Sequence, residues 1–301
     1  MKKLFTLFVS AAAAFVMSMA APAKTPAHVV FIGLDGWGSY TMPKADMPNV
    51  KGLMDRGAWT LKKRSVLPSS SAINWASIFM GAGTEGHGYT EWGSRTPEIP
   101  SIALSKNGIF PTIFTILSEQ KPQAESGVIY EWEGIPFLVD TLATTYHKHV
   151  PVGDNNDSGA ITAEAVRYIK EAKPVLAAII YDNPDHVGHT AGHDTPELYD
   201  IIAYLDGRIG EIIKATKDAG IYHETVFIVS SDHGGIDKGH GGKTLQEMET
   251  PLIMAGPGIK NVGELGSAVM QFDIAPTIAR LLELSTPQPW IGRPVTEALS
   301  E

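Results

Sequence analysis

Short apolar runs alternate along the chain with longer segments in which apolar residues recur every three or four positions. The apolar runs cover residues 28–34, 126–130, 174–181, 225–229 and 251–256. Their length and β-branched composition predict buried strands. The periodic segments at about 48–57, 74–80, 112–120, 160–172, 195–218 and 273–284 predict helices. Strands that alternate with helices predict an α/β fold, in which helices cover a parallel sheet.

Local signals set some boundaries of these elements. Thr195 is expected to cap the long helix, with Pro196 in its first turn. The polar stretch 154–158 is interpreted as the cap of the predicted helix 160–172. It lacks the glycine and distal glutamate of a calcium loop. Residues 83–107 and 131–156 show no periodicity, so the sequence predicts a surface excursion for the first and no defined structure for the second.

The first residues have the layout of a secretory signal peptide. Lys2 and Lys3 precede a mostly apolar stretch that ends in small residues. The stretch is short for a bilayer, which argues against a transmembrane anchor. We expect cleavage after Ala23, or alternatively after Ala20, and therefore a periplasmic or secreted protein. Residues 24–301 then form one catalytic domain, with no other segment that approaches the length of a membrane span.

Composition restricts the available chemistry. The chain has no cysteine, so disulfides and thiolate ligands are excluded and a metal site must use His, Asp and hydroxyl oxygens. The formal net charge is -9, and removal of Lys2 and Lys3 makes it -11. Without a cluster of Lys and Arg, a nucleic-acid scaffold role is disfavoured, and no obligate protein partner is evident. A small anionic substrate needs a local cation, which divalent metals would supply.

Three predicted strands end in acidic residues, and two of these have histidines nearby. These candidate ligands are Asp35, Asp185, His189, Asp232, His233 and His240. Each group alone is explained equally well as a cap, a turn or a satisfied polar pair. The carboxyl ends of parallel strands share one edge of the sheet, however, where α/β proteins bind ligands. Asp and His are good zinc ligands, and six of them suffice for two metals that would favour displacement at phosphorus.

A hydroxyl is the candidate nucleophile. Ser69, Ser70 and Ser71 precede the helix that follows residue 73, and the positive end of a helix favours a bound phosphate. Coordination to a metal would activate such a weakly acidic group. The residues alone leave the three serines in competition, and each is equally able to cap the helix.

Several motifs taken together resemble the alkaline phosphatase superfamily, and in particular its type I phosphodiesterase/nucleotide pyrophosphatase family. They are Gly33-Leu34-Asp35-Gly36, the segment 68–81, Asp185-His186-Val187-Gly188-His189, Ser231-Asp232-His233-Gly234, Gly239-His240-Gly241 and Gln271-Phe272-Asp273. The resemblance extends over nearly all of the chain after the leader. It implies a three-layer αβα sandwich with a mostly parallel central sheet.

The resemblance also implies residue roles and two divalent ions, most simply Zn²⁺. One ion would be held by Asp35, Ser71, Asp232 and His233, and the other by Asp185, His189 and His240. The family places its nucleophile three residues after a Pro and three before an Asn. Pro68 and Asn74 match this spacing and select Ser71. Asn74 is then expected to donate to a phosphate oxygen, helped by the amide of Ala72.

The chain departs from the family pattern at two positions. The nucleophile is usually Thr, and Ser71 stands in its place. His193 occupies a position where the family often has Pro, so we weigh a substrate contact or a group behind the ligands against an ordinary surface histidine. His87 matches a structural turn and is assigned no catalytic role. His186 and Trp92 are candidates for the pocket wall.

These observations favour a hydrolase of phosphodiesters or nucleotide pyrophosphates that acts through a phosphoserine on Ser71. A phosphomonoesterase is expected to carry Arg or Lys beside the nucleophile, and none lies between residues 66 and 81. A sulfatase is expected to have a Cys or Ser followed by Pro and Arg, which is absent after residues 69–71. A non-catalytic metal- or glycan-binding protein is the alternative of a different class.

Overall fold

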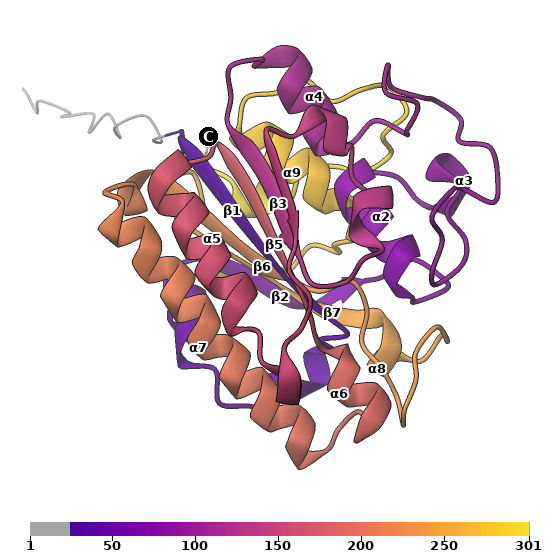
Figure 1. Ribbon diagram of the computed structural model, residues 1–301, viewed down its shortest axis with the longest axis vertical. Coiled ribbons are helices and arrows are strands. Elements are labelled where there is room, and N and C mark those ends of the chain that lie inside the picture. The colour runs from indigo at the N-terminus through magenta and orange to yellow at the C-terminus, as the bar shows by residue number, and fades with distance from the viewer. Residues whose placement is uncertain (1–24, 301) are drawn as a thin grey trace, which may run out of the picture.

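A computed structural model describes residues 25–300, and the predicted leader lies outside them (Figure 1). Its eight strands form one sheet in the order β4-β3-β5-β1-β6-β7-β2-β8. The strands are β1 (His28–Asp35), β2 (Ala58–Arg64), β3 (Ser126–Tyr130), β4 (Tyr146–His149), β5 (Leu176–Pro184), β6 (Thr225–Ser230), β7 (Glu249–Ala255) and β8 (Gly263–Glu264). Only β7 is antiparallel to its neighbours, β6 and β2. The α/β class with a mostly parallel sheet is therefore confirmed.

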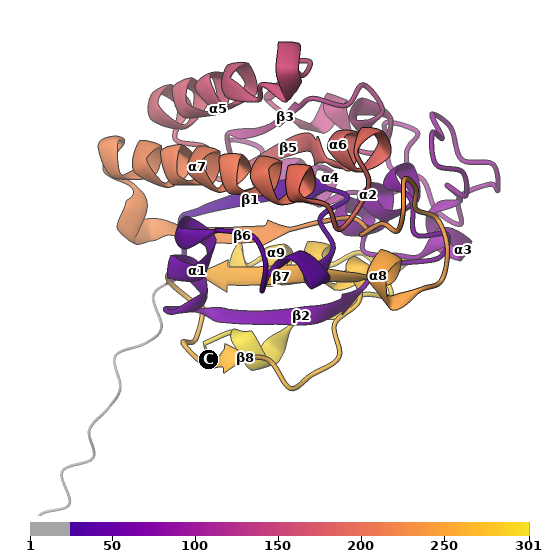
Figure 2. The same ribbon diagram turned by 90° about the horizontal axis from the view of Figure 1, so that it is seen from below.

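Helices cover both faces of the sheet and make it the middle of three layers (Figure 2). The α-helices are α1 (Pro48–Met54), α2 (Ser71–Met80), α3 (Thr84–His87), α4 (Ile113–Gln120), α5 (Gly159–Ala172), α6 (Asp185–Thr190), α7 (Pro196–Asp218), α8 (Leu245–Met248) and α9 (Ile274–Leu281). Residues of α1, α5 and α7 pack on one face, and residues of α2, α4 and α9 pack on the other.

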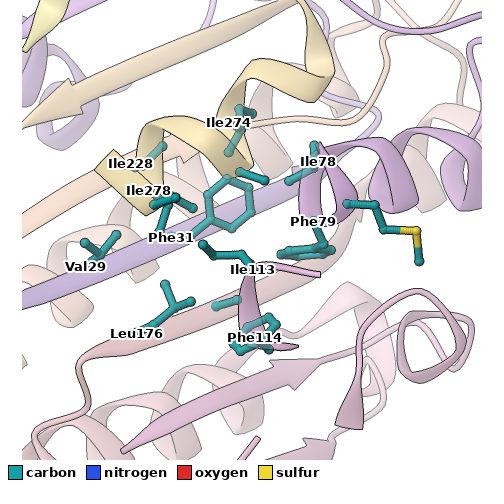
Figure 3. Packing of buried hydrophobic residues seen from close by; sticks show 14 of the residues in the cluster. Val29, Phe31, Ile78, Phe79, Ile113, Phe114, Leu176, Ile228, Ile274 and Ile278 are labelled. Atoms are coloured by element: carbon teal, nitrogen blue, oxygen red, sulfur yellow. The ribbon is translucent and has the colours of Figure 1, made fainter. Parts of the chain in front are cut away.

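The central strand β1 supplies both hydrophobic cores because its side chains alternate between the faces. Phe31 joins the core beneath α2, α4 and α9, whereas Val30 and Ile32 join the core beneath α1, α5 and α7. Figure 3 shows Phe31 surrounded by residues such as Phe79 of α2 and Ile274 of α9. The rings of Phe31 and Phe79 meet edge to face, with centroids 5.8 Å apart. Full burial on both faces holds the end of β1 in a fixed position.

The elements missed by the sequence pattern lie toward the edges of the sheet. β2 carries Lys62, Lys63 and Arg64, and β4 reads Tyr-His-Lys-His with mostly exposed side chains. Neither strand has the apolar run that marks a central strand. The predicted ends also shift: α1 stops at Met54 and α2 starts at Ser71, while a 3₁₀ turn at Gln271–Asp273 precedes α9.

Helix caps agree in part with expectation. Thr195 Oγ1 accepts a hydrogen bond from Leu198 N, as expected of the cap of α7. Ser158 occupies the cap position of α5 without a side-chain cap bond, and Asp157 Oδ1 accepts from Gly159 N at 2.9 Å instead.

Residues 25–300 contain no helix that is both long and apolar enough to cross a membrane.

Candidate metal centre and active site

Three adjacent parallel strands bring the predicted ligands together. Strand β1 lies between β5 and β6, and Asp35 at the end of β1 is in register with Pro184 at the end of β5. Asp185 therefore begins α6 directly beside Asp35. On the other side, Asp232 and His233 follow the end of β6. The shared direction of these strands places residues far apart in sequence at one edge of the sheet.

The inner part of the site surrounds Ser71 at the start of α2. Ser71 Oγ lies 3.1 Å from His233 Nε2. The same nitrogen lies 3.2 Å from Asp232 Oδ2 and 3.4 Å from Asp35 Oδ1. All four residues are buried. Among the three competing serines, the structure therefore places the Ser71 hydroxyl among the acid and histidine side chains.

The outer part of the site is more exposed and is centred on Asp185. His189 Nε2 lies 3.0 Å from Asp185 Oδ2, and His240 Nε2 lies 3.7 Å from the same oxygen. Within residues 25–300, two groups of side chains are compact enough to hold a metal ion: Asp185 with His189 and His240, and Asp35 with Asp185 and His233. Asp185 belongs to both groups, so it lies between the two predicted ligand sets.

The three histidines present the same ring nitrogen to the site. His233 Nδ1 lies 2.8 Å from Gly234 O, and His189 Nδ1 lies 2.9 Å from Lys238 O. His240 Nδ1 lies 3.3 Å from Ser69 O. An Nδ1–H that donates to a carbonyl leaves a lone pair on Nε2, which is the tautomer of a metal-ligating histidine. These contacts direct Nε2 of all three rings toward the carboxylates, although His240 Nδ1 also lies 3.3 Å from Ser70 Oγ.

The carboxylates have unsatisfied oxygens that a cation would complete. Asp35 Oδ1, Asp185 Oδ1 and Asp232 Oδ2 are buried and have no hydrogen-bond partner. Burial together with neighbouring acids raises the pKa of Asp232 to about 7 and raises the pKa of Asp35 well above its usual value. Buried acids without partners are costly. Divalent ions fit this donor set, because they would supply the missing partners and keep the carboxylates ionised.

Buried groups behind the ligands hold them in place. Trp75 Nε1 donates to Asp35 Oδ2 at 2.9 Å, and Gly36 N donates to Asp232 Oδ1 at 3.1 Å. Lys63, on β2, is fully buried and donates from Nζ to Ser231 O at 2.8 Å, and burial lowers the pKa of its ammonium to about 7. Gln271 Nε2 donates to Asp232 O at 2.6 Å. Sequence reasoning missed these supports, because only the fold brings β2 and residue 271 behind the loop.

The two groups expected to donate to a phosphate, the side-chain amide of Asn74 and the backbone amide of Ala72, donate to carbonyl oxygens of the protein. Asn74 is fully buried, its Nδ2 donates to the carbonyls of Val66, Pro68 and Ser70, and its Oδ1 accepts from Val66 N. The amide of Ala72 donates to Trp92 O at 3.1 Å. The bond from Asn74 to a phosphate oxygen therefore stays a prediction, whereas the observed hydrogen bonds of its amide fix the loop before Ser71. Two of these carbonyls also accept backbone amides, Pro68 O from Ser70 N and Ser70 O from Asn74 N.

His193 is neither a surface residue nor part of the pocket lining. Its side chain is fully buried, with Nε2 3.7 Å from Asp185 Oδ1 and Nδ1 3.3 Å from Tyr40 Oη. Gly188 and Gly235 leave room for the ring, since a Cβ at either position would lie within 2.5 Å of it. The ring of His193 thus lies behind Asp185, where a group behind the ligands was one of the alternatives that we weighed for it.

A pocket of about 150 Å³ opens onto the ligands. Its lining comprises Asp35, Ser71, Trp92, Trp132, Asp182, Asp185, His186, His189 and His240. The interpretation of His186 and Trp92 as wall residues agrees with this lining. Trp132 and Asp182 were missed, although Trp132 follows the end of β3 and Asp182 lies in the last residues of β5. Burial and the nearby Asp185 raise the pKa of Asp182 to about 6.

The fold and site define an α/β protein with an acid–histidine centre at the carboxyl edge of its sheet, beside a buried serine. The model of the family described as type I phosphodiesterase / nucleotide pyrophosphatase matches residues 29–271, and the chain belongs to this family.

The curated sequence relatives are much longer than the part of them that aligns with this chain. Human ectonucleotide pyrophosphatase/phosphodiesterase family member 5 is 22% identical over 214 residues, which cover 68% of this chain and 44% of the relative. The GPI ethanolamine phosphate transferase 3 of Schizosaccharomyces pombe is 32% identical over 136 residues, or 43% of this chain and 14% of the relative. The chain thus spans less than half the length of these curated relatives.

Solved structures share the fold. Murine ectonucleotide pyrophosphatase/phosphodiesterase 5, as an inactive variant in complex with AMP, superposes with a TM-score of 0.72 at 18% identity and covers 91% of this chain and 100% of that chain. A 2-O GAG sulfatase superposes with a TM-score of 0.71 at 15% identity, covering 91% and 74% respectively. At these identities the likeness shows the fold alone.

Proposed function

We propose that this protein is an exported, two-metal phosphodiesterase that transfers the phosphoryl group to Ser71 and then to water. The observation that carries the proposal is the convergence of three prepared Nε2 nitrogens and three unpartnered buried carboxylate oxygens beside Ser71 Oγ. Family membership supports ester hydrolysis at phosphorus. A non-catalytic binding protein would have no use for a hydroxyl placed at this point.

The residues of the chain divide the work. Asp35, Asp232, His233 and Ser71 would hold one ion, Asp185, His189 and His240 would hold the other, and Asp185 would also lie near the first. Bound divalent ions supply positive charge that stabilises the phosphate and the ionised hydroxyl. Asn74 fixes the loop that aims Ser71, and the N-terminus of α2 directs its positive end at the same point.

Two displacements complete the reaction. Ser71 Oγ attacks phosphorus, the bond to the first alcohol breaks, and that alcohol leaves with a proton. Water then attacks phosphorus, the bond to Ser71 Oγ breaks, and the serine regains its proton. Each displacement inverts the configuration, so the net result is retention at phosphorus.

The nucleophile is tested with nitrophenyl substrates and purified protein supplied with Zn²⁺. We expect hydrolysis of a nitrophenyl diester ahead of the monoester and the sulfate, and a loss of at least about 1000-fold in Ser71→Ala. Ser118→Ala is the matched control, because Ser118 lies in α4 and only bonds its own helix through Thr115 O. Mass spectrometry of a quenched turnover of the diester should find the phosphate, still esterified to the alcohol that has not left, on the peptide that contains Ser71.

Each contrary result has a distinct meaning. Undiminished turnover by Ser71→Ala would show that another group attacks phosphorus. A preference for the monoester or the sulfate would move the protein to the phosphomonoesterase or sulfatase alternative. Bound metal without turnover of any ester would favour the non-catalytic binding protein.

Export is tested separately. The segment before Ala23 lies outside the described residues, and its proposed role rests on its sequence pattern. We expect the mature protein to begin at residue 24, with residues 24–301 as the catalytic domain, when it is isolated from the periplasm or medium. An intact Met1 in the isolated protein would rule out cleavage.

A further inference from the structure

Asp185 lies at the centre of the site, and three histidine nitrogens face its carboxylate. His189 Nε2 lies 3.0 Å from Oδ2, and His240 Nε2 lies 3.7 Å from the same oxygen. His193 Nε2 lies 3.7 Å from the other oxygen, Oδ1. His189 and His240 share with Asp185 one of the two groups described above that could hold a metal ion, whereas His193 belongs to neither group. The role of His193 is therefore distinct from that of a ligand.

The ring of His193 is held in a slot between the two segments that carry ligands. Its side chain is fully buried. On one side lies Gly188 of α6, the helix that begins with Asp185, and on the other lies Gly235 of the loop after β6. A Cβ at either glycine would collide with the ring. The backbone amide of His193 donates to Asp237 O at 2.6 Å. The ring is thus fixed with Nε2 toward Asp185.

Two buried polar atoms without partners face each other at this point. Asp185 Oδ1 and His193 Nε2 are both buried, and neither makes a hydrogen bond within residues 25–300. Their separation of 3.7 Å is about 0.5 Å longer than a hydrogen bond between nitrogen and oxygen. Buried polar groups without partners are costly. A small rotation of the carboxylate would satisfy both atoms at once.

The contact of the other ring nitrogen determines what His193 can offer to Asp185. Its Nδ1 lies 3.3 Å from Tyr40 Oη, whereas Nδ1 of each predicted histidine ligand lies beside a backbone carbonyl. A phenol is protonated at neutral pH and can donate to a ring nitrogen. A proton on Nδ1 would instead direct the Nε2 lone pair at the carboxylate, where two acceptors repel. The contacts therefore favour a proton on Nε2, the reverse of the metal-ligating tautomer.

The two ligand histidines cannot take over this task. Each can donate a hydrogen bond to Asp185 only while its Nε2 carries a proton, and a histidine that binds a metal through Nε2 presents a lone pair there. His193 lies outside both ligand groups and keeps its proton. Hydrogen bonds from groups behind the ligands are what fixes the orientation of ligating carboxylates.

We propose that Tyr40 and His193 form a positioning pair for Asp185. Tyr40 Oη donates to His193 Nδ1, and His193 Nε2 donates to Asp185 Oδ1, so that Oδ2 stays turned toward His189 and His240. This inference rests on the proposed two-metal function and adds a positioning role to it. The resembled family often has Pro at the position of His193, and Pro offers no such donor.

The tautomer tests the pair without metal. A proton–nitrogen correlation spectrum of the metal-free protein is recorded at pH 7.5, and the signals of the His193 ring are assigned by their loss in His193→Gln. We expect the ring proton on Nε2. A ring proton on Nδ1 would overturn the proposal.

The affinity for Zn²⁺ tests what the pair does for the site. Tyr40→Phe keeps the ring and removes the hydroxyl, and His193→Leu removes both ring nitrogens. We expect each to weaken the binding of one of the two ions by at least about 10-fold in a calorimetric titration. His193→Gln should recover most of the affinity, because its amide nitrogen can occupy the place of Nε2. Tyr168→Phe is the matched control, since it removes a hydroxyl that contacts Glu125 away from the pocket.

The outcomes separate a positioning role from a structural one. Unchanged Zn²⁺ affinity in Tyr40→Phe and His193→Leu, together with lower resistance of the metal-free variants to urea, would show that the pair only fills space and would overturn the proposal. Equal affinities of His193→Gln and His193→Leu would also overturn it. A wild type that binds Zn²⁺ but hydrolyses no diester would refute the proposed function, whereas a loss of affinity in Tyr40→Phe would still support the pair.

Discussion

The chain contains the tripeptide Gly-His-Gly twice, and the fold uses the two histidines in opposite ways. Both His87 and His240 are followed by a glycine with positive φ, which turns the chain sharply after the ring. His87 is fully buried, its Nδ1 accepts from Tyr89 N at 3.1 Å, and its Nε2 lies 3.0 Å from Ser77 Oγ. Both ring nitrogens are therefore used within the protein.

His240 keeps one nitrogen free for the site. Its Nδ1 faces Ser69 O, while its Nε2 faces Asp185 across 3.7 Å. Its ring stacks on His233 with centroids 3.9 Å apart. Burial lowers the pKa of His87 to about 3, and burial together with the neighbouring His233 lowers the pKa of His240 to about 4. Similar sequence and similar pKa therefore accompany different roles, because the free lone pair distinguishes a ligand from a structural histidine.

Removal of the free nitrogen should have the largest effect. His240→Gln is expected to lower kcat/KM for a nitrophenyl diester by at least about 100-fold, because it removes a predicted ligand. The free energy of unfolding of the metal-free protein should change by less than about 1 kcal/mol. His223→Gln, at an exposed position, is the control. A variant with wild-type kcat/KM would place His240 outside the metal centre.

Removal of the structural ring should act on stability instead. His87→Leu would leave the amide of Tyr89 without an acceptor, and Ser77 Oγ would keep only its bond to Ile73 O. We expect a loss of about 3 kcal/mol in the free energy of unfolding, measured by urea denaturation, with His147→Leu at an exposed position as control. A decrease in turnover of folded protein as large as that of His240→Gln would abolish the distinction between the two histidines.

The burial of His87 should also make the stability of the protein depend on pH. The pKa of His87 is about 3 in the folded protein against 6.5 for an ordinary histidine, so the unfolded chain binds the additional proton in this range. Stability therefore falls as the pH decreases from 6.5 toward 3, by about 3 kcal/mol at pH 4.5 from this residue. The gap in unfolding free energy between wild type and His87→Leu should narrow by that amount between pH 7.5 and 4.5. A constant gap would mean that His87 is not held neutral.

The smallest effect is expected for substitution of Trp75, which supports the predicted ligand Asp35 through a hydrogen bond. Trp75→Phe keeps a buried ring but removes the Nε1–H that orients Asp35. Loss of such a support should weaken Zn²⁺ binding by about 10-fold in a calorimetric titration. Trp290→Phe is the matched control, because it removes an indole bond to Pro111 O away from the pocket. Equal Zn²⁺ affinity in both variants would show that Asp35 needs no such support.

Much of this architecture was predictable from local patterns. The runs that became β1, β3, β5 and β6 are apolar because both faces of a central strand are covered, and their carboxyl ends must meet at one edge. Asp35, Asp185 and Asp232 follow from that rule alone. The edge strand β4 and the strand β2, next to the short edge strand β8, carry polar residues, so they gave no comparable signal.

For Asn74 and His193 the spacing of residues did not determine the direction in which the side chain points. Asn74 has the expected position in the chain, but its amide satisfies three loop carbonyls. His193 is polar and near an exposed turn in sequence, yet two glycines open a buried space for its ring behind Asp185. Such outcomes depend on which neighbours the fold supplies and are not encoded in residue spacing.

The sequence by itself determined the α/β class, the edge of the sheet that carries the chemistry and the residue types gathered there, because hydrophobic period and strand direction are local properties. Only the tertiary structure decided which ring nitrogen of each histidine is free, that Asp185 lies between both ligand groups, and that Trp92, Trp132 and Asp182 line one pocket. These depend on contacts between segments far apart in the sequence, such as that between Ser70 and His240, which are 170 residues apart. Hydrogen bonds between buried polar groups select those orientations once the chain is packed.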